Sequence, residues 1–217
     1  MAAMNVGVLG SGAVGQTLAD GFLRHGYTVM RGSREPAKLE EWKAGAGASA
    51  SIGRFADAAK FGQLVVLAVK GTGAEDAIAQ CGDGALDGKT VIDTTNPIAD
   101  APPVNNVIQL FTGPNDSLME RLQKRWPKVK FVKAFSCVGN ALMVNPDLGG
   151  IKPTMFLCGN DAGAKAEVEE ILAAFGWEWE DMGGVEGARA IEPLVSLWCI
   201  PGFIRGTWGH AFKLLRK

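Results

Sequence analysis

Residues 5–15 read NVGVLGSGAVG, and this stretch decides the fold. Its apolar first half is typical of a short buried strand, and residues 16–25 continue as a helix. Between them lies Gly-x-Gly-x-x-Gly, the dinucleotide-binding fingerprint in the strand–turn–helix context that it requires. Gly10 permits the tight turn, Gly12 leaves room for a pyrophosphate, and Gly15 allows the helix to pack closely. The phosphates are expected on free N–H groups at the positive end of the helix.

The end of the second predicted strand, residues 27–31, indicates which dinucleotide binds. NAD-specific sites usually place Asp or Glu about 20 residues past the glycines, where it bonds the ribose 2′-hydroxyl. This chain has Ser33 and Arg34 there, with Lys38 shortly after them. Arginine can hold a phosphate through two parallel hydrogen bonds, so the pattern favours NADP(H). Glu35 leaves some use of NAD open, because it can pair with Arg34 or bond a ribose hydroxyl.

The composition describes a well-packed globular protein of 217 residues, 47% of them hydrophobic and 21% charged. A net charge of −1 provides no basic field for nucleic acid. No segment approaches the roughly 20 apolar residues of a membrane span, and no signal peptide is expected before the first strand. Four scattered cysteines indicate reduced thiols, and two distant histidines indicate no metal site. A cytoplasmic location is therefore expected.

Strand and helix patterns alternate along most of the chain. The run 63–69 is apolar throughout, which is typical of a strand buried on both faces of a parallel sheet. The alternation predicts an α/β protein, with a Rossmann-type, doubly wound, mostly parallel sheet and helices on both faces. Residues 98–114 are expected to be irregular. The further expected strands are 27–31, 48–51, 90–93, 129–135, 155–158 and 177–179, and the further helices are 36–44, 54–61, 73–81, 117–126 and 162–175.

The pattern changes near the C-terminus. We expect an NADP-binding domain over 1–182 and a short helical C-terminal extension over 183–217, within the same compact unit. Residues 185–197 are helix-like, Pro201-Gly202 is expected to break this helix, and 205–215 are expected to form a second one. The extension is rich in aliphatic and aromatic residues, which need burial against the sheet or a partner. A homodimer is therefore expected.

Ligands of open α/β sheets bind beyond the carboxyl ends of the strands. Three such ends carry polar residues, at 69–73, 94–97 and 134–140, and none holds a histidine or an isolated carboxylate placed as a general acid. Oxidation of an alcohol needs proton transfer to oxygen, so this pattern disfavours it. Hydride transfer to a flavin or deazaflavin suits the pattern better, because the protein then mainly positions two rings.

The residues at these strand ends also have structural explanations. Asn96 can serve the turn before Pro97, and Lys70 can be a surface charge rather than a cofactor contact. Cys137 is better explained as a small buried thiol than as a reactive one. Met143 can serve packing alone.

Several short motifs extend from the first strand to the C-terminal extension. They are VLGSGAVG at 8–15, GSR at 32–34, DTTNP at 93–97, KAF at 133–135, and Ala188-Arg189, Glu192-Pro193-Leu194 and Leu197-Trp198. Together they resemble the NADPH-dependent coenzyme F420 reductases, also called F420-dependent NADP oxidoreductases. The first motif is shared by many dehydrogenases, whereas the combination is much more specific.

The resemblance implies where the cofactor binds. It places NADP at the first two strand ends and the nicotinamide at the later ones, and it implies a dimer built partly from C-terminal helices. Lys70, beside Val69, is a further candidate for the cofactor site. The implied contacts are Ser11, Ala13, Val14, Ser33, Arg34 and Lys38 for NADP, and Val69, Asn96 and Ala134 for the nicotinamide.

An acceptor pocket is expected beside the nicotinamide, bordered by Ser136, Asn140 and Met143 and shaded by the loop 98–114. The deazaflavin F420 is the first expected acceptor and a flavin, FMN or FAD, the second, because the family includes ferric reductase relatives that pass hydride to flavin. Members often have Asn at the place of Ser136, and the long 98–114 loop is not typical of the deazaflavin enzymes. An imine, carbonyl or ferric reductase and a non-catalytic NADP sensor are the alternatives.

Overall fold

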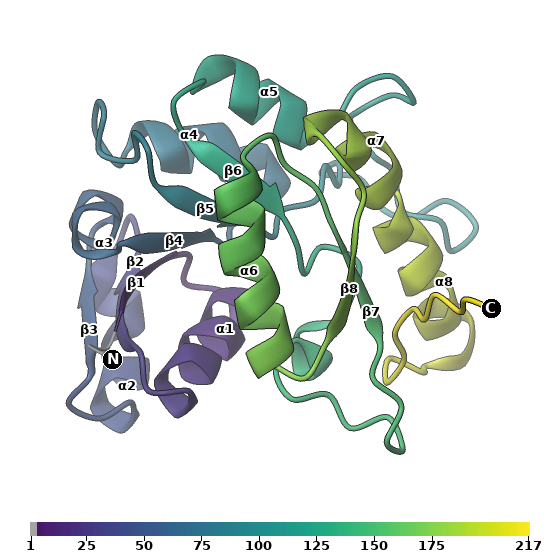
Figure 1. Ribbon diagram of the computed structural model, residues 1–217, viewed down its shortest axis with the longest axis horizontal. Coiled ribbons are helices and arrows are strands. Elements are labelled where there is room, and N and C mark those ends of the chain that lie inside the picture. The colour runs from purple at the N-terminus through teal and green to yellow at the C-terminus, as the bar shows by residue number, and fades with distance from the viewer. Residues whose placement is uncertain (1–3) are drawn as a thin grey trace.

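The main sheet has six parallel strands in the order β3-β2-β1-β4-β5-β6 in the computed structural model (Figure 1). The structure describes residues 4–217, so the first three residues of the predicted 1–182 domain lie outside it. The strand order reverses between β1 and β4, which confirms the Rossmann-type, doubly wound fold. The strands are β1 (Asn5–Leu9), β2 (Thr28–Gly32), β3 (Ala50–Gly53), β4 (Leu64–Leu67), β5 (Thr90–Asp93) and β6 (Lys130–Lys133).

Helices cover both faces of this sheet. On β4, Leu64 and Val66 join an apolar cluster with helices α1 (Ala13–Arg24) and α6 (Ala162–Ala174), which lie in front of the sheet in Figure 1. The alternate residues of β4 join a second cluster on the opposite face. The apolar run is therefore buried on both sides, as its sequence predicts. The opposite face is covered by α3 (Phe55–Phe61), α4 (Ala74–Ala79) and α5 (Leu118–Arg125), while η1 (Pro36–Leu39) and α2 (Glu40–Gly45) follow β2.

A second, two-stranded parallel sheet lies beside β6. It consists of β7 (Thr154–Leu157) and β8 (Glu178–Asp181), joined by α6. An antiparallel bridge between Lys133 and Cys158 connects it to the end of β6. The small sheet therefore continues from the β6 edge of the main sheet toward the C-terminal segment. Three further 3₁₀ helices, each one turn long, lie in the connections: η2 (Gly71–Gly73), η3 (Asn140–Leu142) and η4 (Val185–Gly187).

The segment 98–114 contains a short hairpin, which corrects the expectation of an irregular loop. Val104 and Val107 exchange two backbone hydrogen bonds of 2.9 and 3.0 Å. Between them, Asn105 and Asn106 have φ values of 48° and 67°. Two consecutive residues at positive φ make the type I′ turn, whose twist matches that of paired strands. At its base, Ile98 is bridged to Leu110, which holds the arm beside the end of β5.

The C-terminal helices differ from the sequence prediction. After α7 (Ala188–Ile191), helix α8 (Leu194–Arg205) runs through Pro201 rather than ending there. Proline deprives the carbonyl of Leu197 of its helical donor, but Leu197 lies on the exposed side, where water can replace the bond. Gly202 provides a notch for the Trp208 ring, since a Cβ there would lie 2.3 Å from it.

Residues 206–217 contain no helix, so the predicted second helix over 205–215 is wrong. Gly206, at φ 68°, ends α8 in the left-handed conformation. The chain then returns along β7, where the Thr154 N–H donates to the carbonyl of Phe212 at 2.9 Å. Pairing with a sheet edge satisfies this backbone in place of helical hydrogen bonds.

Several large apolar side chains of the C-terminal segment stay on the surface. Leu197, Phe203, Ile204 and Trp208 are each at least 41% exposed, which is more than a monomer usually leaves in one segment. The homodimer stays a prediction. Within residues 4–217, no helix has the length and apolar character needed to cross a membrane.

Candidate active site

The glycine loop between β1 and α1 has the geometry that a pyrophosphate site needs. Gly10 has φ 148°, and a Cβ there would lie 2.1 Å from the carbonyl oxygen of Ala68, so only glycine fits. A Cβ at Gly12 would meet nothing within 4 Å, so this position faces open space. Helix α1 begins at Ala13, directly after the loop. Its first N–H groups have no intrahelical partners and are available to an anion.

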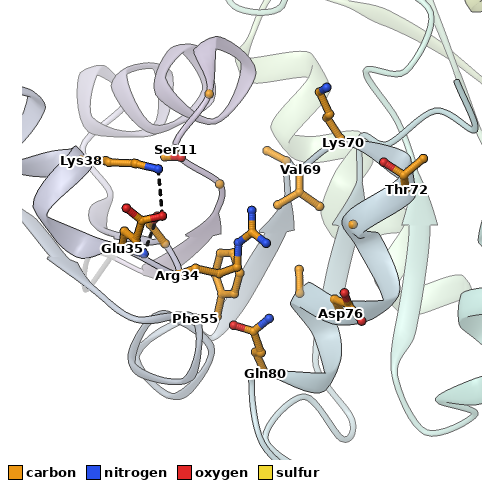
Figure 2. Close-up of a pocket in the computed structure, with 16 residues that line it drawn as sticks. Ser11, Arg34, Glu35, Lys38, Phe55, Val69, Lys70, Thr72, Asp76 and Gln80 are labelled. Carbon is orange, nitrogen blue, oxygen red and sulfur yellow. Dashed lines mark hydrogen bonds and ion pairs between the residues drawn. The ribbon is translucent and has the colours of Figure 1, made fainter. Parts of the chain in front are cut away.

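A cavity of about 490 Å³ opens over the ends of β1, β2 and β4 (Figure 2). Figure 2 shows Arg34 pointing into it from the end of β2, with Lys38 on one side and Val69 and Lys70 on the other. Ser33 is buried, whereas Arg34 and Lys38 are exposed. These lining residues include eight that the sequence predicts for the cofactor, namely Gly10, Ser11, Gly12, Ser33, Arg34, Lys38, Val69 and Lys70.

Glu35 pairs with Lys38 rather than with Arg34. The Lys38 Nζ lies 2.9 Å from Glu35 Oε1, and this hydrogen bond lowers the pKa of the Glu35 carboxyl below its usual value. The Glu35 N–H also donates to Ser33 Oγ at 3.2 Å. The carboxylate is thereby held beside Lys38, while the Arg34 guanidinium reaches into the cavity (Figure 2).

A second cavity of about 420 Å³ adjoins the first, and both are lined by Gly12, Ala68, Val69 and Lys70. The two cavities therefore follow each other across the switch point between β1 and β4. Lys70 stands at their junction with a side chain that is 86% exposed and 3.9 Å from Asp100. The second cavity is further lined by Ala13, Val14, Gly71, Thr94, Thr95, Asn96, Ile98, Ala99 and Asp100.

Asn96 connects the loop after β5 with the loop after β6. Its Nδ2 donates to the carbonyl of Ser136 at 2.7 Å. Phe135 adopts φ 61°, a conformation that bulky residues rarely take, and this bend leads into Ser136. Among the described residues, neither Asn96 Oδ1 nor Ser136 Oγ has a hydrogen-bond partner, although both are buried. The turn between the two loops therefore leaves one polar atom of each residue unsatisfied.

The other residues predicted around the acceptor are less accessible. Ala134 and Met143 are buried, and neither they nor Ser136 and Asn140 line the two cavities. The Asn140 side chain donates to the hydroxyl of Thr17, a residue of α1, at 3.3 Å. The structure thus brings Ser136 to Asn96, while the acceptor roles of Asn140 and Met143 stay predictions.

Cys137 is a buried thiol. It is 2% exposed, and burial raises its pKa to about 11. The thiolate, which is the reactive form, is therefore scarce at neutral pH.

A buried ion cluster lies directly behind the strand ends, and sequence reasoning missed it. Lys133 Nζ lies 2.7 Å from Asp93 Oδ2, 2.8 Å from Glu192 Oε1 and 2.8 Å from the Thr95 carbonyl. All three charged side chains are at most 1% exposed. Burial alone would lower the pKa of Lys133, but the carboxylates of Asp93 and Glu192 raise it. All three residues stand in the short motifs quoted above, but those motifs did not indicate that the residues meet.

The same cluster fastens the C-terminal segment to the sheet. The Glu192 carboxylate accepts the N–H groups of Leu118 and Met119 at 2.9 and 3.0 Å, which caps the start of α5. Three residues earlier, Arg189 binds Glu120 of that helix through Nε and Nη2. The C-terminal motif thus holds α7 against α5.

Two comparisons with known proteins identify the family. Residues 5–97 match the family model described as NADP oxidoreductase, coenzyme F420-dependent. A crystal structure of a proposed F420-dependent NADP reductase from Arthrobacter sp. FB24 is 32% identical over 99% of this chain and all of that one, with a TM-score of 0.91. The chain belongs to the F420-dependent NADP oxidoreductase family. It is therefore an NADP-dependent oxidoreductase, as the sequence motifs predict.

Other proteins are similar to this oxidoreductase at lower identity. A hypothetical protein, SMa0349 from Sinorhizobium meliloti, is 25% identical over 99% of this chain and 96% of its own, with a TM-score of 0.76. Metalloreductase STEAP3 of Rattus norvegicus is 28% identical over 204 residues, but the chain spans only 38% of that protein. An imine reductase from Aspergillus terreus, 20% identical over 95% of this chain and 64% of its own, shares the fold with a TM-score of 0.67.

Arg34→Ala is expected to weaken NADPH binding selectively. Charge-assisted hydrogen bonds to a phosphate contribute enough that losing them should raise the NADPH dissociation constant about 10- to 100-fold. NADH lacks the 2′-phosphate, so its dissociation constant should change little. Calorimetric titration with both cofactors measures this difference. Arg24→Ala, at the far end of α1, is the matched control, and equal losses for NADPH and NADH would contradict the role of Arg34.

Proposed function

We propose that this oxidoreductase binds NADP(H) across the two cavities and exchanges hydride with a deazaflavin of the F420 type or, as the second choice, a flavin. The single observation that carries the proposal is the pair of adjoining cavities at the switch point. The first has the cations and glycine backbone that suit an adenosine phosphate. The second has few groups able to exchange a proton.

The first cavity and the junction fit NADP(H) residue by residue. Ser33, Arg34 and Lys38 would hold the 2′-phosphate, and the open backbone at Gly12 would hold the pyrophosphate. At the other end, Asn96 lines the second cavity, where it would border the nicotinamide. When bound, NADPH supplies a hydride from its nicotinamide ring.

The second cavity suits an acceptor that needs no acid from the protein. The Thr94 hydroxyl donates to the Leu67 carbonyl, and the Thr95 hydroxyl donates to Asp93, so both are already engaged. Among its lining residues, the ionisable ones are Lys70 and Asp100, which are exposed and lie beside each other. A planar redox ring can take its proton from solvent, whereas an imine or carbonyl substrate usually requires a positioned acid.

A ferric acceptor is supported by the name of one relative. Metalloreductase STEAP3, at 28% identity over 92% of this chain, is named for the reduction of metal. A ferric acceptor is therefore an alternative to the deazaflavin and the flavins.

Acceptor assays test the proposal. The protein is mixed with NADPH and, separately, with F420, FMN, FAD or a ferric chelate, and the loss of NADPH absorbance is followed. We expect the fastest oxidation with F420, then with the flavins. NADPH binding without turnover of any acceptor would contradict an enzyme of this type and favour an NADP sensor.

A filled second cavity provides the structural control. Ala99→Trp should place a ring in that cavity, at the loop after β5, and abolish acceptor turnover, while NADPH stays bound through its phosphates in the first cavity. Ala101→Trp, two residues along at an exposed position outside the cavity, should retain turnover. Similar activity in both variants would place the acceptor elsewhere.

A further inference from the structure

A buried arginine lies beneath the glycine loop. Arg31, the penultimate residue of strand β2, is 1% exposed and carries a guanidinium group into the protein. Its Nη2 lies 3.3 Å from the carbonyl oxygen of Gly10 and 3.3 Å from that of Gly12. The guanidinium carbon stands 4.8 Å from the centre of the Trp42 ring, which covers it from the other side.

These two hydrogen bonds bear on the direction of two amides. In a trans peptide the C=O and N–H groups of one unit point in opposite directions. Arg31 holds the Gly10 carbonyl inward, so the N–H group of Ser11 is turned outward. The Gly12 carbonyl also accepts the Gln16 N–H at 3.0 Å, so Arg31 and helix α1 together direct the N–H group of Ala13. Ser11 and Ala13 each line a cavity at the loop.

The charge of Arg31 is only partly compensated inside the protein. Burial lowers the pKa of the guanidinium, and nearby Asp20 partly offsets this effect. The Asp20 carboxylate also accepts a hydrogen bond of 2.7 Å from Trp42 Nε1. Among the described residues, Arg31 Nε has no hydrogen-bond partner. A buried cation with weak compensation is stabilised when an anion approaches from the far side of the loop.

We propose that Arg31 is a positioning residue for the cofactor's pyrophosphate, acting through the backbone of residues 10–13. It aims the Ser11 and Ala13 amides at the cavity and adds positive charge beneath them. The proposal rests on the cofactor site described above, with the pyrophosphate at Gly12.

A third cavity offers a competing explanation for the position of Arg31. Arg31 borders a polar cavity of about 510 Å³ that Ser11 and Lys38 also line, so the competing explanation is direct contact with the 2′-phosphate there. The two roles differ in which cofactors they affect. Every dinucleotide has the pyrophosphate, whereas only NADP(H) has the 2′-phosphate.

Arg31→Met and Arg31→Lys test the proposal by calorimetric titration with NADPH, NADH and adenosine 2′-phosphate. For Arg31→Met we expect the dissociation constants of NADPH and NADH to rise by a similar factor, about 10- to 100-fold. Both cofactors lose the positive charge and the orientation of the Ser11 and Ala13 N–H groups. Adenosine 2′-phosphate, which lacks the pyrophosphate, should lose much less. Arg31→Lys keeps a charge but not the planar fork, and should recover part of the affinity.

Controls separate a folding defect from the positioning role. Arg125→Met removes a second arginine that stacks on a tryptophan, Trp126, at the end of α5, and should bind both cofactors nearly as the wild type does. Melting temperatures are measured for each variant, and Arg31→Lys alone decides the matter if Arg31→Met does not fold. Unchanged affinities, or a loss confined to NADPH, would overturn the proposal. Failure of the wild type to bind NADPH would instead refute the proposed function.

Discussion

Replacing Lys133 with methionine is expected to lower the free energy of unfolding by about 3–5 kcal/mol, because it leaves two buried carboxylates without their cation. Asp93 and Glu192 lie 2.7 and 2.8 Å from the ammonium, and both are shielded from water. Denaturant unfolding at neutral pH measures the change. The surrounding strand should tolerate the methionine volume, so charge rather than shape sets the size of the effect.

Lys130→Met is the matched control on the same strand. Lys130 is 41% exposed and pairs with Asp161 at 3.2 Å, and surface pairs of this kind contribute about 1 kcal/mol or less. Equal losses in the two variants would contradict the special role of the buried cluster. The pKa of Lys133 is raised in the folded state, so its stabilisation is complete below the unfolded pKa of about 10.4. It is lost only as the pH rises through the folded pKa, so the difference should be constant around neutrality.

Gly12→Val should abolish NADPH binding while leaving the fold intact. A Cβ at Gly12 meets nothing within 4 Å, so the valine has space in the protein, but that space is the cavity at the phosphate loop. We expect the NADPH dissociation constant to rise about 100-fold or more, a loss of at least about 2.7 kcal/mol. Calorimetric titration together with a thermal melt measures both effects.

Two other glycines calibrate this result. Gly113→Val also places its side chain in open space, but far from the phosphate loop in sequence, and should bind NADPH normally. Gly10→Val would clash with Ala68 and is expected to impair folding itself. Near-normal affinity in a folded Gly12→Val protein would mean that the pyrophosphate lies elsewhere.

The sheet could be predicted from sequence because its signals are local. The apolar run of β4 and the glycines after β1 each dictate their own backbone and need no distant partner. The cofactor end was equally accessible, since Ser33 and Arg34 follow directly from the end of β2.

The rest depends on contacts between distant segments. Nothing near Lys133 in the sequence indicates that its partners are Asp93 and Glu192, on other elements. Pro201 was expected to end a helix because proline removes a backbone hydrogen bond. The helix continues through it because the carbonyl that loses this bond, on Leu197, lies on the exposed side. The hairpin at 104–107 did carry a local signal, two asparagines between two valines, which the surrounding prolines concealed.

The position of Glu192 has a consequence for how the chain folds during synthesis. Every strand of the main sheet emerges from the ribosome before residue 192 does. Until then Lys133 has one of its two carboxylates, and the first amides of α5 lack their cap. The nascent domain therefore holds a buried lysine with half of its charge partners until residue 192 has been synthesised.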